Sequence, residues 1–488
     1  MRLHRNLCFA VIDGLTLIFN EGKYADKVIQ QLLKRDKRWG ARDRGFVAET
    51  TYDIVRWKRL YAEIAEVKEP FDRDNLWRMF AVWATLKGVK LPDWKYFENE
   101  FSEYYSDTGR PSMPVRLMVG SLMLKRICNL GDETVCEAWI RDPYMQYFCG
   151  MAHFEHEFPC DPSDFVHFRK RIGEAGVEKI FAYSVQLHGR AAREKLTLSD
   201  TTVAENNTTF PTDAKLAKKI IDKCNEIAKK EGVDQRQSYI RISKQLLRNT
   251  HNPSHPKRRN KAKKSGQKLK TIAGRLVREL IRKLPDQQLA QYQKDLDLFF
   301  KVLAQKRSDK NKIYSLHKPF TSCIAKGKAH KQYEFGNKIG LITTFKTLII
   351  TAIKSFEGNP HDSKTIEPLL DQMKSNFNYT PQEVVYDRGG KGQKQIGNTK
   401  VSTPDYKPLK RDTEYQRRSK RKKFRRRAAI EPVIGHLKSG YRMGQNYLSG
   451  SSSPQINAFL AATGWNLKKL MKQLKSEFNL SLFQINNL

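Results

Sequence analysis

Three acidic residues, Asp200, Asp387 and Glu431, have the type and placement of a metal-binding catalytic site. Residues 196–200 and 383–387 are apolar segments that end in an aspartate, and Glu431 begins a helical stretch. Converging carboxylates repel one another unless a cation neutralises them, and Mg²⁺ or Mn²⁺ takes carboxylate and phosphate oxygens as ligands. Two such ions activate a water or a 3′-hydroxyl for phosphoryl transfer. The sequence therefore predicts these three acids as catalytic residues and metal ligands.

Positive charge dominates the composition. The 488 residues include 90 Lys and Arg against 52 Asp and Glu, a formal net charge of +38. A solvated surface is the alternative reading, but so large an imbalance destabilises a compact chain by self-repulsion. A polyanion that releases counterions on binding explains the charge better. With a phosphoryl-transfer site, this charge predicts cutting and joining of double-stranded DNA, although composition alone does not separate DNA from RNA.

The sequence argues against several other classes of protein. No stretch approaches the roughly 20 apolar residues of a membrane span, so no membrane partner is expected. Residues 1–7 lack the apolar core of a secretory signal. The seven cysteines form no Cys-x-x-Cys pair, which predicts free thiols in the cytoplasm and no zinc site.

Strand and helix signals predict how the acids are positioned. After the strand at residues 196–200, the predicted elements are a hairpin (338–344 and 347–353), a turn (358–362), a helix (364–373), a strand before Asp387 (384–386) and a helix (428–438). This order predicts an α/β fold with a ribonuclease H-like catalytic core over residues 195–450. A basic helical insertion, about residues 205–335, interrupts the core after its first strand.

Two dense blocks of positive charge are candidate phosphate-binding segments. Residues 256–270 have few apolar residues and are expected to be a tether between helices. Nine of the twelve residues 416–427 are Lys or Arg. The helix that follows is expected to place Arg427, Glu431 and Lys438 on one face, because their spacing is close to whole turns. A simple ladder of ion pairs on a solvated helix is the alternative.

Residues 1–92 predict an all-α bundle from apolar residues at helical spacing. Its segments 1–7, 34–45 and 52–57 resemble the NusB-like RNA-binding domain of bacterial rRNA cytosine-C5 methyltransferases. This resemblance implies rRNA as a partner. No Gly-rich methyl-donor loop and no Pro-Cys nucleophile in a suitable context follow it, and a bundle without a binding role is the alternative.

Residues 100–190 predict a second helical domain. A short helix near residues 165–172 is expected to expose the basic run 169–171, which could read DNA as part of a helix-turn-helix. The alternative is an ordinary helical domain whose aromatic residues form the core. Residues 451–488 predict a helical tail.

The region from about residue 100 to 450 resembles the DDE transposases of bacterial insertion sequences. The family signature Tyr-(2)-Arg-(3)-Glu-(6)-Lys falls on Phe424, Arg427, Glu431 and Lys438. The segments that resemble the contexts of the first and second acids are 198–202 (Leu-Ser-Asp-Thr-Thr) and 385–389 (Val-Tyr-Asp-Arg-Gly), and those at 110–120 and 335–340 are also similar to the family.

The resemblance implies that Asp200, Asp387 and Glu431 bind Mg²⁺ or Mn²⁺ while neighbouring side chains contact DNA. Of these, Arg427 and Lys438 are expected from the resemblance to contact DNA phosphates near the cut. The other predicted DNA-binding residues are Phe424, Arg388, Lys422 and Lys423, of which the two lysines belong to the basic block. The sequence departs from the family at Phe424, which lacks the hydroxyl of the expected tyrosine. It departs again at Gly390, where the family often has an aromatic residue.

Together the two resemblances predict a chimera, in which an insertion sequence has entered an rRNA methyltransferase gene. The expected junction lies near residues 92–105. The predicted activity is Mg²⁺-dependent cleavage and strand transfer by a homodimer on transposon-end and target DNA, in the nucleoid of a bacterium. The alternatives are a non-catalytic remnant that binds rRNA and a nuclease that cuts without strand transfer.

Overall fold

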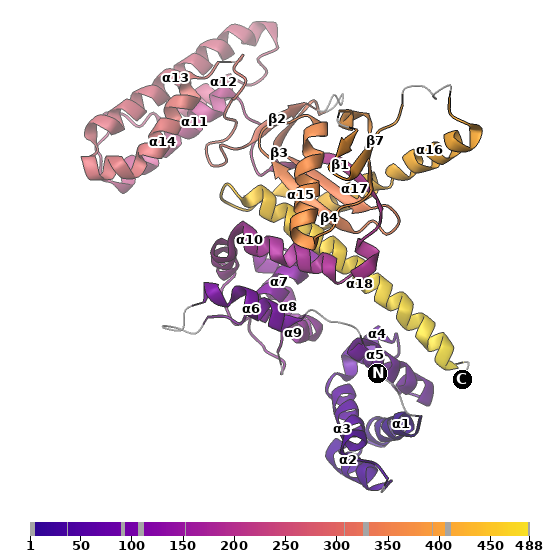
Figure 1. The fold of residues 1–488 in the computed structure, drawn as a ribbon. Helices are drawn as coiled ribbons and strands as arrows, with labels where there is room; N and C mark the ends of the chain where they lie inside the picture. The colour runs from indigo at the N-terminus through magenta and orange to yellow at the C-terminus, as the bar shows by residue number, and fades with distance from the viewer. Residues whose placement is uncertain are drawn as a thin grey trace. The chain divides into compact units, whose positions relative to one another are not determined.

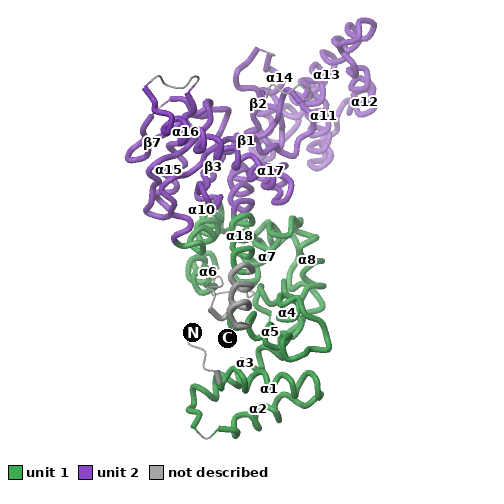
Figure 2. Tube along the Cα trace, turned by 90° about the vertical axis from the view of Figure 1, so that its right-hand side faces the viewer, with its two compact units in different colours: residues 1–189, 463–488 green, residues 190–462 purple. Residues whose placement is uncertain are grey.

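A computed structural model describes residues 5–36, 38–88, 93–105, 112–151, 153–306, 308–325, 331–392, 394–405 and 411–486. The chain divides into two compact units, one of residues 1–189 and 463–488 and one of residues 190–462 (Figure 2). The expected junction near residues 92–105 and the segment that begins at Arg110 lie partly outside the described residues.

The N-terminal part of the first unit is a helical bundle. On the second helix, Val28, Ile29 and Leu32 are buried because their spacing puts them on one face. Val28 and Leu32 join a larger core to which every helix of the bundle contributes. The helices are α1 (Arg5–Phe19), α2 (Ala25–Lys34), α3 (Ala41–Arg56), α4 (Lys58–Ile64) and α5 (Arg73–Gly88) (Figure 1). RNA binding by this bundle stays a prediction.

Five further α-helices follow in the described part of residues 93–186 of the first unit. They are α6 (Trp94–Phe101), α7 (Val115–Ile127), α8 (Asp132–Arg141), α9 (Pro143–Phe148) and α10 (Asp164–Gln186). The short helix expected near residues 165–172 is only the first part of α10. Gly173 interrupts α10 with a φ of +61°, a conformation that glycine adopts without strain, and the helix then continues.

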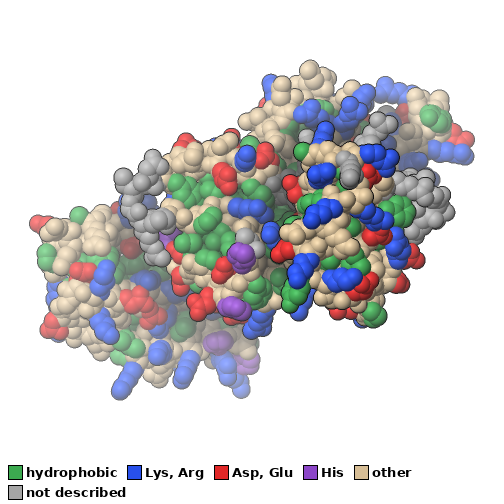
Figure 3. Space-filling view, turned by 90° about the horizontal axis from the view of Figure 1, so that it is seen from below, with side chains coloured by type: hydrophobic (Ala, Val, Ile, Leu, Met, Phe, Trp, Pro, Cys, Tyr) green, Lys and Arg blue, Asp and Glu red, His purple; other side chains and the backbone are tan. Residues whose placement is uncertain are grey.

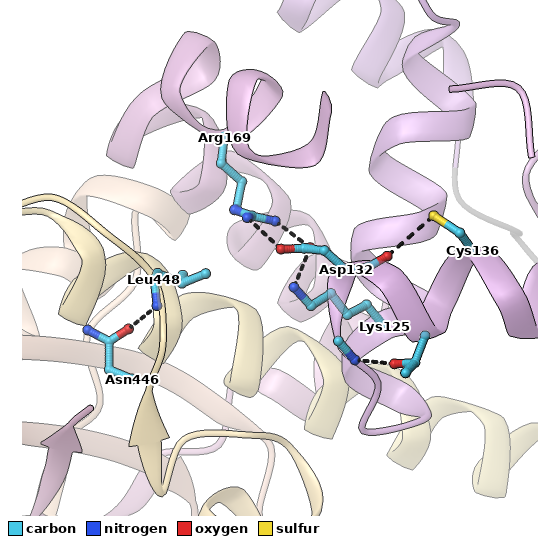
Figure 4. A network of polar contacts seen from close by, with 8 residues as sticks. Lys125, Asp132, Cys136, Arg169, Asn446 and Leu448 are labelled. Atoms are coloured by element: carbon cyan, nitrogen blue, oxygen red, sulfur yellow. Dashed lines mark hydrogen bonds and ion pairs between the residues drawn. The ribbon is translucent and has the colours of Figure 1, made fainter. Parts of the chain in front are cut away.

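The prediction that residues 169–171 are exposed is wrong for Arg169. Its side chain is 7% exposed, and its guanidinium makes two hydrogen bonds to Asp132, of 2.8 and 2.9 Å (Figure 4). Lys125, also buried, lies 2.5 Å from the same carboxylate. The periodicity of α10 places Arg169 on the buried face with Phe165 and Ile172. A buried guanidinium needs an acidic partner, and Asp132 provides it.

The second unit is built on a mixed β-sheet with the order β2-β3-β1-β5-β7-β6 (Figure 1). In addition, β4 pairs with β3 and β8 pairs with β1. Strand β3 is antiparallel to β1, β2 and β4, whereas β1, β5 and β7 are parallel neighbours. The strands are β1 (Leu196–Asn206), β2 (Ser322–Ala325), β3 (Tyr333–Thr344), β4 (Ile350–Phe356), β5 (Glu383–Val385), β6 (Gln395–Ile396), β7 (Thr399–Ser402) and β8 (Gln445–Asn446).

The predicted hairpin at residues 338–353 is confirmed. Strands β3 and β4 pair from Lys338 opposite Phe356 to Thr343 opposite Ile350, with an irregularity after Ile342. The helix expected next begins as a short 3₁₀ turn, η3 (Asp362–Thr365), and continues as α15 (Ile366–Phe377). Apolar side chains of α15 pack with those of β3, β4 and β5 in one core.

The insertion between β1 and β2 contains four helices with a core of their own. They are α11 (Asp213–Lys230), α12 (Ile240–Asn249), α13 (Pro256–Lys283) and α14 (Asp286–Ala304). The expected tether at residues 256–270 is wrong, because this block is the first half of α13. Ala262, Ser265 and Leu269 give it a buried face, and Pro256 suits the first helical turn. The lysines and arginines occupy the remaining faces.

The last helices are α16 (Glu414–Arg427), α17 (Ile430–Gly440) and α18 (Ser453–Asn486). The helix expected from residue 428 begins instead at Ile430, so Arg427 ends α16 and Glu431 opens α17. No residue of α16 is buried. None of the helices described combines the length and hydropathy of a membrane span. Lys and Arg side chains are spread across the face in Figure 3, with acidic side chains between them.

Candidate active site

Asp200 lies in the middle of β1, and the prediction that it ends a strand is wrong. The strand continues through Thr201 and Thr202 to Asn206, because β3 pairs with it along this length and Asp200 stands opposite Leu341. The Asp200 side chain is 13% exposed. Its Oδ1 accepts a hydrogen bond of 2.8 Å from the backbone N–H of Thr201, so Oδ2 remains for other partners.

Parallel pairing brings Asp387 beside Asp200. Strands β1 and β5 align Leu196 with Glu383 and Leu198 with Val385, and the same register continued by two residues aligns Asp200 with Asp387. Asp387 follows the end of β5, and its side chain is 36% exposed. Its Oδ1 is nevertheless buried and makes no hydrogen bond, which leaves one carboxylate oxygen without a partner.

The guanidinium of Arg427 joins all three predicted acids. It donates from Nη2 to Oδ2 of Asp200 over 2.9 Å, and the same nitrogen lies 3.8 Å from Oδ2 of Asp387. Its Nη1 lies 3.7 Å from Oε1 of Glu431, which is 63% exposed. Acids from a strand, from the loop after a second strand and from a helix thus surround one cation.

Burial and charge act in opposite directions on Asp200. Burial raises the pKa of the Asp200 carboxyl above its ordinary value, and Arg427 together with the backbone N–H of Thr201 lowers it again. The nearby carboxylate of Asp387 favours the protonated form as well. The net shift in the pKa of Asp200 is upward.

The donor set fits a hard divalent cation, because it consists of carboxylate oxygens and one of them, Oδ1 of Asp387, is buried without a partner. As the side chains stand, no three His, Cys, Asp or Glu side chains in the described ranges close on a common metal position. The guanidinium of Arg427 lies between the three acids, where a metal would otherwise bring them together.

The remaining residues expected to bind DNA differ in their surroundings. Lys422 and Arg388 are exposed, and Lys438 is partly exposed on α17. Lys423 instead lies 2.5 Å from Oε1 of Glu383, and its Nζ is 5.9 Å from the ring of Phe424. Burial raises the pKa of Glu383, but hydrogen bonds from Lys423 and Ser402 outweigh burial and lower it overall. Lys423 therefore anchors α16 to β5.

Asp362 is an acidic residue near the site that the sequence interpretation missed. Its Oδ1 accepts a hydrogen bond of 3.0 Å from the hydroxyl of Thr201 and lies 2.5 Å from Nζ of Lys338. The sequence signal for it is an aspartate a few residues after a strand, but the segment 358–362 has the composition of a turn, which explains the same residue without a role in the site. The partner Lys338 comes from β3 and has no local sequence relation to it.

Gly389 makes room between two of these carboxylates. A Cβ at this position would lie 2.7 Å from Oδ2 of Asp362 and 3.0 Å from Oδ1 of Asp387. Both distances are shorter than ordinary contacts, so only glycine leaves this space open. The two oxygens thus face the same small volume beside the loop that follows β5.

Comparison with known proteins gives two family matches. The transposase domain DUF772 matches residues 85–171, and the transposase DDE domain matches residues 305–467. The second range includes Asp387, Arg427 and Glu431 but begins after Asp200. No solved structure matches the chain.

A curated relative, from Rhizobium meliloti, is described as uncharacterized protein ORF8 in the nfe locus. It is 41% identical over 156 residues, which are 31% of this chain and 75% of that protein. The mixed α/β sheet of the second unit is compatible with the catalytic core of a DDE transposase. On these matches, the chain belongs to the DDE transposase family.

Proposed function

We propose that this transposase cuts and joins DNA at Asp200, Asp387 and Glu431. The observation that carries the proposal is the convergence of these three side chains on one guanidinium. The antiparallel order β4-β3-β1 followed by parallel β5 and β7 supports a ribonuclease H-like core. In such an arrangement, the register of parallel β1 and β5, continued by two residues, sets Asp200 beside Asp387.

The three carboxylates would hold Mg²⁺ or Mn²⁺, as transposases of this family use divalent metal ions. When bound, the metal activates the attacking oxygen and stabilises the leaving one. In the first step, water forms a bond to phosphorus, the bond from phosphorus to the 3′-oxygen breaks, and that oxygen takes a proton. In the second step, the freed 3′-hydroxyl loses its proton and attacks a target phosphodiester, which releases the target's own 3′-hydroxyl.

Basic helices would hold the DNA. On α16, Lys422 and its neighbours project from a helix that buries no side chain. The first half of α13 carries its lysines and arginines on fixed helical faces around a buried strip. Phosphate contacts of this kind position a duplex without reading its sequence, and they weaken steeply as the salt concentration rises.

A nicking assay tests this function with the full chain, supercoiled plasmid that carries the DNA flanking the gene, and Mg²⁺. We expect Asp387→Asn to lower the nicking rate at least 100-fold while DNA binding is kept. Asp371→Asn, which changes an exposed aspartate on α15, should nick like the wild type. Equal nicking by wild type and Asp387→Asn would refute the assignment, and an assay for joining to target DNA separates a transposase from a nuclease.

A further inference from the structure

Arg427 holds a position that its role as a DNA contact does not explain. Its side chain is 18% exposed, and its guanidinium lies among three carboxylates from separate elements. Its Nε is buried and makes no hydrogen bond, so the head group is held in place by the acids. By contrast, the neighbouring Arg426 donates to the backbone oxygens of Phe345 and Lys346, over 2.9 and 2.8 Å.

The oxygen that Arg427 occupies is the one that a metal would need. Oδ1 of Asp200 already accepts the backbone N–H of Thr201, and Oδ2 accepts Nη2 of Arg427. The lone pair of Oδ2 that accepts the hydrogen bond from Arg427 cannot coordinate a metal ion at the same time. The distances from Arg427 to Asp387 and Glu431 show that it neutralises the same charges as well.

We propose that Arg427 is a placeholder cation that competes with the divalent metal for the three carboxylates. In the DNA-free chain it holds the acids together, and it lowers their affinity for metal. Release of the guanidinium from Asp200 then accompanies metal entry, since two ligands that exclude each other must weaken each other's binding. This inference rests on the proposed function, because it takes the three acids as the metal ligands.

Mn²⁺ binding to the full chain without DNA tests the competition. Paramagnetic resonance counts free Mn²⁺, and calorimetry gives the dissociation constant. The variants are Arg427→Met, which keeps the aliphatic length of the side chain, and Arg427→Ala. We expect both to bind Mn²⁺ at least tenfold more tightly than the wild type. Arg425→Ala, which removes an equal charge from an exposed position on the same helix, should stay within about twofold.

A stability measurement supplies an independent readout. Without metal, Arg427→Met leaves three carboxylates with no common cation, so its melting temperature in EDTA should fall below that of the wild type. Added Mn²⁺ should raise the melting temperature of the variant more than that of the wild type, because ligand binding stabilises the folded state according to affinity.

The outcomes separate this inference from the proposed function. Tighter Mn²⁺ binding in both Arg427 variants, lost on adding Asp387→Asn, supports the competition. Equal or weaker binding in the Arg427 variants overturns the placeholder role, while loss in Asp387→Asn alone still supports the metal site. If Asp387→Asn leaves Mn²⁺ binding unchanged in the wild type and in both Arg427 variants, the metal site of the proposed function is wrong. The placeholder role is then wrong as well.

Discussion

The hydroxyl of Thr201 donates a hydrogen bond of 3.0 Å to Oδ1 of Asp362, one residue along β1 from the partly buried carboxylate of Asp200. Lys338 contacts the same oxygen. This arrangement ties the first predicted acid to a charged pair that comes from β3 and from the turn after β4. Asp362 is therefore a candidate positioning residue.

Replacing Asp362 should impair nicking without unfolding the chain. Asp362→Asn keeps the shape but removes the charge that Lys338 and Thr201 face, and charge-assisted hydrogen bonds contribute about 1.5–3 kcal/mol. We expect the Mg²⁺-dependent nicking rate to fall about tenfold, with a larger loss in Asp362→Ala. Asp371→Asn serves as the control, and wild-type rates in both Asp362 variants would contradict the role.

Gly389 offers a steric test of the same region. In Gly389→Ala, the added methyl group would press on Oδ2 of Asp362 and Oδ1 of Asp387. We expect nicking to fall at least tenfold while the melting temperature changes little, because the loop is partly exposed. Gly45→Ala on α3, where nothing lies within 4 Å of the new Cβ, should leave nicking unchanged. A fully active Gly389→Ala would show that this space is not needed.

The buried charges of the first unit should be sensitive to loss of their shared partner. Asp132→Ala removes the carboxylate that Lys125 and Arg169 share. Breaking a buried ion pair in this way lowers the free energy of unfolding by about 3–5 kcal/mol. Hydrogen exchange of peptides from α7 and α8 should report this loss as faster exchange. The exposed Glu137→Ala on α8 is the matched control. Unchanged protection in Asp132→Ala would contradict the prediction.

Acid should destabilise the first unit through His188. Burial lowers the pKa of His188 below its ordinary value of 6.5, although the hydrogen bond to the backbone oxygen of Asn466 opposes this. Because Nε2 faces that oxygen, Nδ1 is the site of proton uptake, and it is buried without a partner. The unfolded chain thus binds the proton more readily, so stability is lost as the pH falls below about 6.5.

The measurement is the melting temperature of the first unit at pH 7.5 and pH 5.5. The wild type should lose more stability on acidification than His188→Gln, which cannot take up this proton. His167→Gln, at an exposed position on α10, controls for general effects of removing a histidine. If the melting temperatures of wild type and His188→Gln fall equally between pH 7.5 and pH 5.5, His188 does not cause the acid sensitivity.

Local pattern predicted the elements whose burial follows from adjacent residues. The hairpin of β3 and β4 is an example, because its two apolar strands follow each other after a short connection at residues 345–349. The local sequence pattern gave the wrong prediction where contacts between distant residues determine the structure. Asp200, Thr201 and Thr202 look like a strand end, yet β3 continues the pairing past them. In α13, the density of lysines concealed the buried strip of Ala262, Ser265 and Leu269.

The sequence pointed to three acids for the candidate site but gave no sign of the contacts between them. The sequence pointed to Asp200, Asp387 and Glu431, and the structure places all three around Arg427. The ion pair of Arg427 with Asp200 spans 227 positions of the chain, so no local periodicity could reveal it. Asp362 was missed for the same reason, since its partners Lys338 and Thr201 reach it only through the pairing of β3 with β1.

The four insertion helices close around their own apolar core, and the chain leaves the sheet after β1 and returns at β2. The pairing of β1 with β3 and β5 therefore does not depend on how many residues the insertion contains. A chain that exchanged these helices for a short loop would keep Asp200 at the same place in its strand. Substitutions in the insertion helices therefore need not disturb the site at Asp200, so the two parts of the chain can diverge in sequence independently.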